Sequence, residues 1–167
     1  MILAFTYPFM KRFTYWPQLF LGLTFNWGII MAWSAMNNFI SLEIVILYIS
    51  AIFWTLGYDT IYGAQDMSDD EIIGLKSTAI KFKENLNLFI SSCYLISSVL
   101  VICVFFILEK SFFVIFLFLF MLSLFYQIKI YNVKNSDSCL KAFKFNNFSG
   151  FLLFISFFLI SIKNLWN

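Results

Sequence analysis

Five long apolar runs limit what this chain can become. A helix that crosses the hydrocarbon core of a bilayer needs about 20 predominantly apolar residues, within a usual range of about 17–25. Only two prolines and six glycines occur in 167 residues, so little interrupts such helices. The qualifying runs cover residues 18–36, 42–58, 86–108, 111–131 and 148–165. The sequence therefore predicts an all-α, polytopic transmembrane helix bundle with five complete spans.

The composition favours a bilayer as the solvent of this chain. Hydrophobic residues make up 62% of it and charged residues 12%, whereas a soluble domain carries about 25% charged residues. A formal net charge of +2 is too small to indicate nucleic-acid binding. The absence of histidine excludes catalysis or metal binding by that side chain. The three cysteines have no metal-ligand spacing, so we interpret them as small apolar fillers or inert thiols.

The basic residues divide unequally between the two sides of the predicted bundle. Nine of the eleven lie in three alternate connections: before the first span, after the second, and between the fourth and fifth. Lys and Arg accumulate in loops that are not translocated, so these connections are expected to face the cytoplasm, or the matrix in a mitochondrial inner membrane. We predict a tight hairpin at Glu109 and Lys110, and the end of a preceding helix in residues 1–13.

Residues 58–79 hold five of the nine acidic side chains. If the second predicted helix continues beyond Tyr58, then Asp59, Asp66 and Asp70 are spaced i, i+7 and i+11 and share one helical face. Like charges four residues apart destabilise a helix unless something neutralises them. Magnesium is suited to this, because it takes one or two carboxylates and completes its shell with water and phosphate oxygens. A solvated acidic loop is the alternative, although acidic residues beside hydrocarbon favour a function.

Basic side chains are expected to lie near these carboxylates. Lys76 follows Asp70 by six residues, and Lys11 and Arg12 belong to another connection on the same side. Carboxylates, a metal ion and flanking cations at a membrane surface indicate a diphosphate site, and an apolar bundle beside it suits a lipid tail. An ion-transport protein is a weaker alternative, because the spans carry no ionisable residue at mid-depth.

Three stretches in order carry a family resemblance. The sequence "YDTIYGAQDMSDDEIIGLKSTA" at 58–79 resembles the second aspartate-rich motif of UbiA-type membrane prenyltransferases. The sequence "YPFMKRFTYWPQLFLG" at 7–22 resembles the segment before the fifth helix of that family, and "CLKAFKFNNFSG" at 139–150 the segment leading into its last helix. Within the family, the chain is most similar to the 4-hydroxybenzoate polyprenyltransferases.

The resemblance implies a reaction and a setting. Mg2+, held by two aspartate-rich motifs, would grip a polyprenyl diphosphate and stabilise the charge that develops as the C–O bond breaks. The ring of 4-hydroxybenzoate would attack the allylic cation ortho to its hydroxyl, a step of ubiquinone biosynthesis. The implied setting is the lipid bilayer of a bacterial or mitochondrial inner membrane.

The resemblance also implies roles for individual residues. Asp66 and Asp70 would be the catalytic pair that binds the metal ion, and Asp59, which stands in the same motif, is implied in both roles as well. The residues implied in substrate binding are Lys11 and Lys76 for the diphosphate, Arg12 for the carboxylate of the aromatic acid, and Tyr62, Asn146 and Asn147. Tyr62 would shield the cation with its ring, or be an ordinary interfacial tyrosine. The two asparagines would contact substrate, or cap the end of a helix.

The first aspartate-rich motif of the family, of the form NDxxDxxxD, has no counterpart here, because no aspartate precedes Asp59. We therefore expect residues 1–167 to form the C-terminal part of a UbiA-like transmembrane domain. The chain would then be a truncated gene product, one half of a split gene whose N-terminal half is separately encoded, or a fragment of a longer protein. The alternative is a non-catalytic remnant or a partner subunit of a split enzyme.

Overall fold

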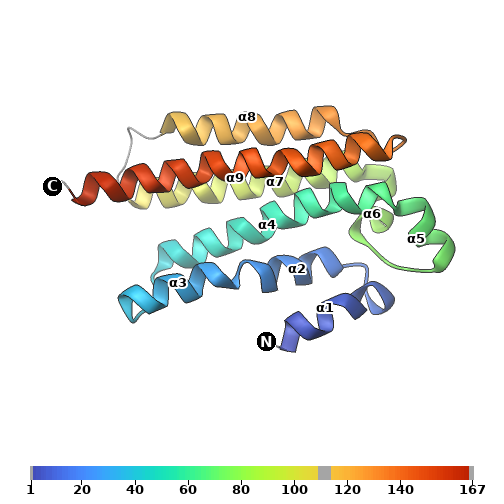
Figure 1. Cartoon of the computed structure of the whole chain (residues 1–167), viewed down its shortest axis with the longest axis horizontal. Coiled ribbons are helices and arrows are strands. Elements are labelled where there is room, and N and C mark those ends of the chain that lie inside the picture. The colour runs from blue at the N-terminus through green and yellow to red at the C-terminus, as the bar shows by residue number, and fades with distance from the viewer. Residues whose placement is uncertain (1, 109–113, 166–167) are drawn as a thin grey trace.

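The computed structural model of the chain describes residues 2–108 and 114–165, and this part is almost entirely helical. The helices are α1 (Ile2–Phe13), α2 (Pro17–Phe25), α3 (Trp27–Asn37), α4 (Leu42–Gln65), α5 (Met67–Ile73), α6 (Thr78–Lys81), α7 (Leu86–Ile107), α8 (Val114–Ile130) and α9 (Ser136–Leu165), with a 3-10 turn at Lys83–Asn85. Figure 1 shows long helices that run roughly alongside one another, with the two shortest helices, α5 and α6, together at one end.

The predicted spans are found in order. Within the described residues, four helical segments are long and apolar enough to cross a membrane, and a shorter apolar helix covers Ile115–Ile130. The four segments are Pro17–Asn37, Leu42–Gln65, Lys83–Ile107 and Ser136–Leu159. The all-α transmembrane bundle is therefore confirmed, and α1 is the additional helix expected at the start. The hairpin predicted at Glu109 and Lys110 lies outside the described residues.

The last connection differs from the prediction. The spans predicted at 111–131 and 148–165 leave a linker between them over residues 132–147, but α9 already begins at Ser136. The Ser138 hydroxyl closes the preceding turn, accepting from the Asn132 amide at 2.8 Å and donating to the Asn135 carbonyl at 2.7 Å. Cys139 and Ala142 are fully buried, so the first turns of α9 have an apolar face that packs inward. The linker prediction was wrong because this stretch is amphipathic rather than uniformly polar.

Helix α4 is the centre of the bundle. It contacts α2 and α3 on one side and α7 and α9 on the other. Gly57 brings α4 close to α7, because a Cβ at that position would lie 2.4 Å from Cε1 of Tyr94. On the side towards α8 and α9, Trp54 packs edge-on against Phe120 with ring centroids 5.2 Å apart.

A chain of buried polar side chains joins α7, α8 and α9. The Tyr94 hydroxyl donates to Oε1 of Gln127 at 2.6 Å, and Nε2 of Gln127 donates to the Ser149 hydroxyl at 2.8 Å. Ser123 donates to Ser149 at 2.8 Å. All four residues are buried, and the Ser123 hydroxyl also contacts the Phe120 carbonyl at 2.6 Å, so these polar groups find their partners inside the protein.

Replacing Gln127 by leucine is expected to lower the free energy of unfolding by about 1–2 kcal/mol, because it leaves the buried Tyr94 hydroxyl without an acceptor. Reversible unfolding in mixed detergent micelles measures this. Tyr126→Phe on the same helix is the matched control, since Tyr126 is 50% exposed and its ring contact with Phe145 survives the change. Equal stability of the two variants would contradict the role given to Gln127.

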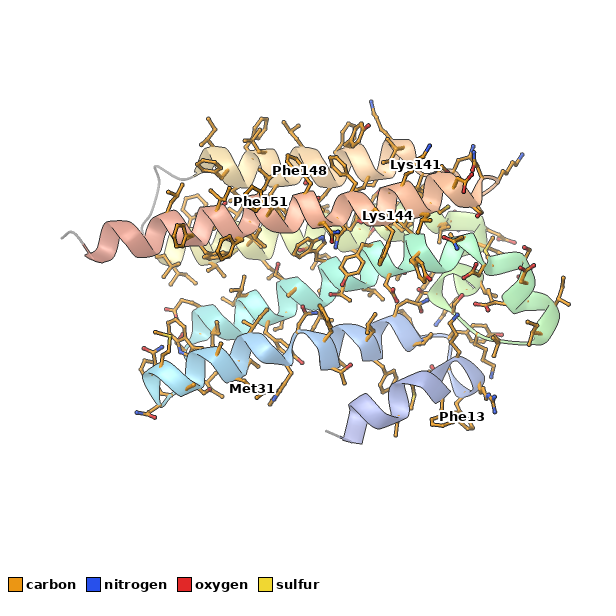
Figure 2. The ribbon with its side chains drawn as sticks, viewed as in Figure 1. Phe13, Met31, Lys141, Lys144, Phe148 and Phe151 are labelled. Atoms are coloured by element: carbon orange, nitrogen blue, oxygen red, sulfur yellow. The ribbon has the colours of Figure 1, made fainter. Side chains whose placement is uncertain are left out.

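The outer surface of the bundle carries large apolar side chains. Figure 2 shows Phe148 and Phe151 on α9 and Met31 on α3 projecting from the ribbon. Each of these three side chains is at least half exposed. Such a surface suits contact with lipid tails rather than water.

Candidate functional site

The candidate site lies at the end of the bundle where the short helices gather (Figure 1). Here α4 ends at Gln65, and residues 66–77, which we call the acidic loop, lead through α5 to the start of α6. Gly74 ends α5 in the left-handed conformation, with φ 79°, and the Leu75 amide donates back to the Asp70 carbonyl at 2.8 Å. This is a glycine-dependent helix end, and it turns the chain back towards the bundle.

The three predicted aspartates do not share one continuous helix. The second predicted helix does continue beyond Tyr58, and Asp59 lies on α4, but the helix stops before Asp66. Asp66 joins α4 to α5 with φ −105° and ψ 11°, and Asp70 lies within α5. The prediction of a single face through Asp70 was therefore wrong. Aspartate and serine compete for backbone hydrogen bonds and favour helix ends, and residues 66–70 hold four of them.

The acidic loop and the end of α1 meet as the sequence predicted. Nζ of Lys11 forms an ion pair with Oδ2 of Asp70 at 3.0 Å, and Asp70 is only 6% exposed. The Lys76 amide donates to the Lys11 carbonyl at 2.7 Å. The Lys11 ammonium also interacts electrostatically with Asp59. Three elements therefore bring four of the predicted site residues to one place.

The other cations are less constrained. Nζ of Lys76 donates to the Phe13 carbonyl at 3.4 Å and lies 5.5 Å from the centroid of the Tyr15 ring. Arg12 is exposed, and no hydrogen bond or ion pair to it is found within the described residues. Both side chains are accessible to an anion from solvent.

An aromatic wall adjoins the site on α4. Tyr62 is 38% exposed, and its ring lies 4.7 Å from that of Phe143 on α9. Tyr58, one turn earlier, lies 5.8 Å from the same ring. The wall gives the polar end of the bundle an apolar, π-rich side.

Asn146 and Asn147 lie inside α9, ten residues beyond its start, so the alternative that they cap a helix end was wrong. Asn147 is exposed, whereas Oδ1 of Asn146 is buried and has no hydrogen-bond partner. In the part of the chain that the structure describes, no hydrogen bond or ion pair links either asparagine to the acidic loop. They therefore lie within the body of α9 rather than at its first turn.

The carboxylates are suitable magnesium ligands but do not form a complete set. Among the described residues, no group of three or more Asp, Glu, Cys or His side chains could hold a metal ion. Magnesium is commonly held by one or two carboxylates and completes its octahedron with water and phosphate oxygens. Asp66 is half-buried and accepts a hydrogen bond from Gln65 at 3.3 Å, while Asp70 pairs with Lys11. Their donor chemistry fits the ion, with further ligands supplied by phosphate.

The sequence prediction missed the side chains that fasten the end of the acidic loop. Gln18 is 3% exposed, and its Oε1 accepts from the Thr78 amide at 3.1 Å. The Thr60 and Thr78 hydroxyls are 2.6 Å apart. The available signal was a lone amide at the start of an apolar run, which needs a buried partner if it packs inward.

Comparison with known proteins identifies the class. A sequence profile of the UbiA prenyltransferase family matches residues 1–160, and the chain belongs to that family. It is 42% identical over 157 residues to the 4-hydroxybenzoate octaprenyltransferase of Pasteurella multocida, covering 93% of this chain and 54% of the relative. It is 56% identical over 86 residues to the mitochondrial 4-hydroxybenzoate polyprenyltransferase of Homo sapiens, covering 51% and 23%.

A solved structure, the apo structure of a UbiA homolog from Aeropyrum pernix K1, has the same fold. The TM-score is 0.75 at 21% identity, over 94% of this chain and 60% of that one. The chain spans about half the length of the curated relatives that it matches along most of its own length. The part matched is their C-terminal half.

Proposed function

We propose that this chain forms part of an enzyme that transfers a polyprenyl group from polyprenyl diphosphate to 4-hydroxybenzoate, in ubiquinone biosynthesis. The observation that supports this best is the meeting of Lys11, Lys76 and Asp70 at one end of an apolar bundle. A polyprenyl diphosphate has the matching form, with an anionic head and a long apolar tail. We take 4-hydroxybenzoate as the acceptor of the prenyl group from the names of the relatives.

The residues of the chain would act mainly by electrostatics. When bound, Mg2+ neutralises the negative charge that develops on the leaving diphosphate. Asp66 and Asp70 would hold the ion, with Asp59 adding negative charge nearby. Lys11 and Lys76 would contact the diphosphate oxygens as point charges. The Lys11–Asp70 ion pair holds both side chains in place before any ligand arrives.

The remaining predicted residues would serve the acceptor and the cation. The exposed guanidinium of Arg12 can grip a carboxylate with two parallel hydrogen bonds. The ring of Tyr62 presents a π face that attracts an allylic cation. The unpaired Oδ1 of Asn146 is an acceptor that suits the hydroxyl of an aromatic acid. We place the acidic loop on the cytoplasmic or matrix side of an inner membrane, in keeping with the distribution of basic residues.

We infer that activity requires the helices that correspond to the N-terminal half of the relatives, because the first aspartate-rich motif would supply the remaining metal ligands. The test uses membranes that contain this chain, the N-terminal half of the Pasteurella multocida relative, or both. Prenylation of 4-hydroxybenzoate is measured with and without Mg2+. We expect product only with both halves and Mg2+, at least about 100-fold above either half alone. No product with both halves present would instead favour a non-catalytic remnant.

A further inference from the structure

Gln18 occupies the point where α2, α4 and α6 meet. It lies in the first turn of α2, and its amide is buried. Its Oε1 accepts a hydrogen bond from the Thr78 amide, the first of α6. The opening amides of a helix have no acceptor within the helix, and Thr78 is fully buried. Gln18 therefore supplies the acceptor that this amide cannot obtain from water.

Two residues of α4 complete the junction. A Cβ added to Gly63 would lie 3.0 Å from Nε2 of Gln18 and 3.8 Å from Cβ of Ala79. The second distance is an ordinary van der Waals contact, but the first is tighter, so a side chain at position 63 would displace the Gln18 amide. One turn earlier, Thr60 donates its proton to the Leu56 carbonyl at 2.6 Å, so the Thr78 hydroxyl donates to Thr60. The start of α6 is thus fixed by both its amide and its side chain.

The position of Thr78 determines that of the lysines. Lys76 precedes Thr78 by two residues in an extended segment, and its amide donates to the Lys11 carbonyl. Lys11 in turn forms the ion pair with Asp70 at the other end of the acidic loop. A shift of Thr78 would therefore move Lys76 away from Lys11 and change the setting of the Asp70 carboxylate. Gln18 itself has no hydrogen bond to any of these charged groups within the described residues.

We propose that Gln18 is a positioning residue that holds the acidic loop in the arrangement needed to bind a magnesium diphosphate. This rests on the proposed function for the identity of the ligand. Gln18 acts through Thr78 and Lys76 and does not touch the reacting atoms. Gly63 is its partner on α4, because it leaves the space that the amide occupies.

Two variants reach the junction from different helices, and each has a matched control. Gln18→Leu removes the acceptor, and Gly63→Ala displaces the amide from the α4 side. Asn26→Leu is the control for the first, since Asn26 also ties α2 to α4, through Ala51 and Thr55, but away from the loop. Gly28→Ala is the control for the second, because no heavy atom lies within 4 Å of its added Cβ.

The first measurement is amide hydrogen exchange of residues 66–79 in the intact chain in detergent or nanodiscs. We expect both junction variants to raise the exchange rate about tenfold or more, and both controls to leave it within about twofold. The second measurement uses the two-half enzyme. The half-saturating Mg2+ concentration should rise about tenfold in the junction variants, while kcat at saturating Mg2+ changes less than about threefold.

The outcomes separate this inference from the proposed function. Faster exchange in the junction variants alone, with no turnover even in the unmodified protein, would support the positioning role and refute the proposed reaction. Unchanged exchange in Gln18→Leu and Gly63→Ala would overturn the inference, as would an equal increase in Asn26→Leu. A fall in kcat with an unchanged Mg2+ requirement would also overturn it.

Discussion

Prenyl transfer by the two-half enzyme is expected to fall at least about 100-fold when Asp70 is replaced by alanine, and by a similar factor in Asp66→Ala. Each substitution removes a carboxylate from the half of the metal site that we propose for this chain. The loss should be mainly in kcat, because charge stabilisation matters most as the C–O bond breaks. Product formation at saturating Mg2+ and polyprenyl diphosphate measures it.

A neighbouring carboxylate provides the control for this experiment. Asp69 is adjacent to Asp70 on the same short helix, but it is exposed, and among the described residues its carboxylate meets only the Ser68 hydroxyl, at 3.5 Å. Asp69→Ala should keep activity within about threefold of the unmodified protein. The loss in Asp70→Ala would not reflect unfolding, because the Lys11 side chain left behind is 39% exposed and remains hydrated. Full activity in both Asp66→Ala and Asp70→Ala would refute the metal assignment.

Gly57→Ala is expected to have the largest effect on stability, lowering the free energy of unfolding by about 2–3 kcal/mol. The added methyl would lie 2.4 Å and 2.6 Å from two ring carbons of Tyr94. That ring cannot move aside easily, because it is 3% exposed and its hydroxyl is held by Gln127. The helices α4 and α7 would have to separate, and unfolding in mixed detergent micelles measures the cost.

Gly28→Ala tests the same change of residue without the packing conflict. Gly28 is exposed on α3, where the added methyl meets nothing. Alanine favours a helix over glycine by about 0.5–1 kcal/mol, so this variant should be as stable as the unmodified protein or slightly more stable. Similar losses in Gly57→Ala and Gly28→Ala would show that the contact with Tyr94 is not what α4 requires.

The spans were predictable because a long apolar run with few prolines must satisfy its backbone hydrogen bonds within the segment when it lies in lipid, and an α-helix does this. The start of α9 could not be predicted in this way, because its first turns mix lysines with small apolar residues. Hydropathy averages such a stretch to a polar value, whereas its buried side, with Cys139 and Ala142, is visible only once a neighbouring helix is in place. For α4 the error was the opposite one, a helix predicted too long. The predicted acidic face extended to Asp70, whereas the helix ends before Asp66.

The charged residues of the candidate site could be predicted from the sequence, but the hydrogen bonds that hold them in place could not. Motif resemblance brought Lys11, Lys76 and Asp70 into one hypothesis, and the fold places them together. Gln18 escaped because its hydrogen bond spans 60 positions in the sequence. The lone amide at the start of an apolar run indicates that Gln18 needs a buried partner, but not that the partner is Thr78. The substrate contact expected of Asn146 and Asn147 stays a prediction, and their position within α9 could not be predicted without the start of that helix.

Because α9 starts early, its exposed side chains indicate where the surface of the membrane crosses the helix. Lys141 and Lys144 project from the same helix as Phe148 and Phe151 (Figure 2), and all four are exposed. Ammonium groups stay at the level of lipid headgroups and exposed phenylalanines enter the hydrocarbon, so the boundary crosses α9 between Lys144 and Phe148. Phe143 lies on the headgroup side and contacts Tyr62 of α4. We therefore expect the acidic loop beyond Tyr62 to lie level with the phosphates of the surrounding lipids, where the prenyl diphosphate that we propose as substrate would arrive by lateral diffusion without lifting its tail from the bilayer.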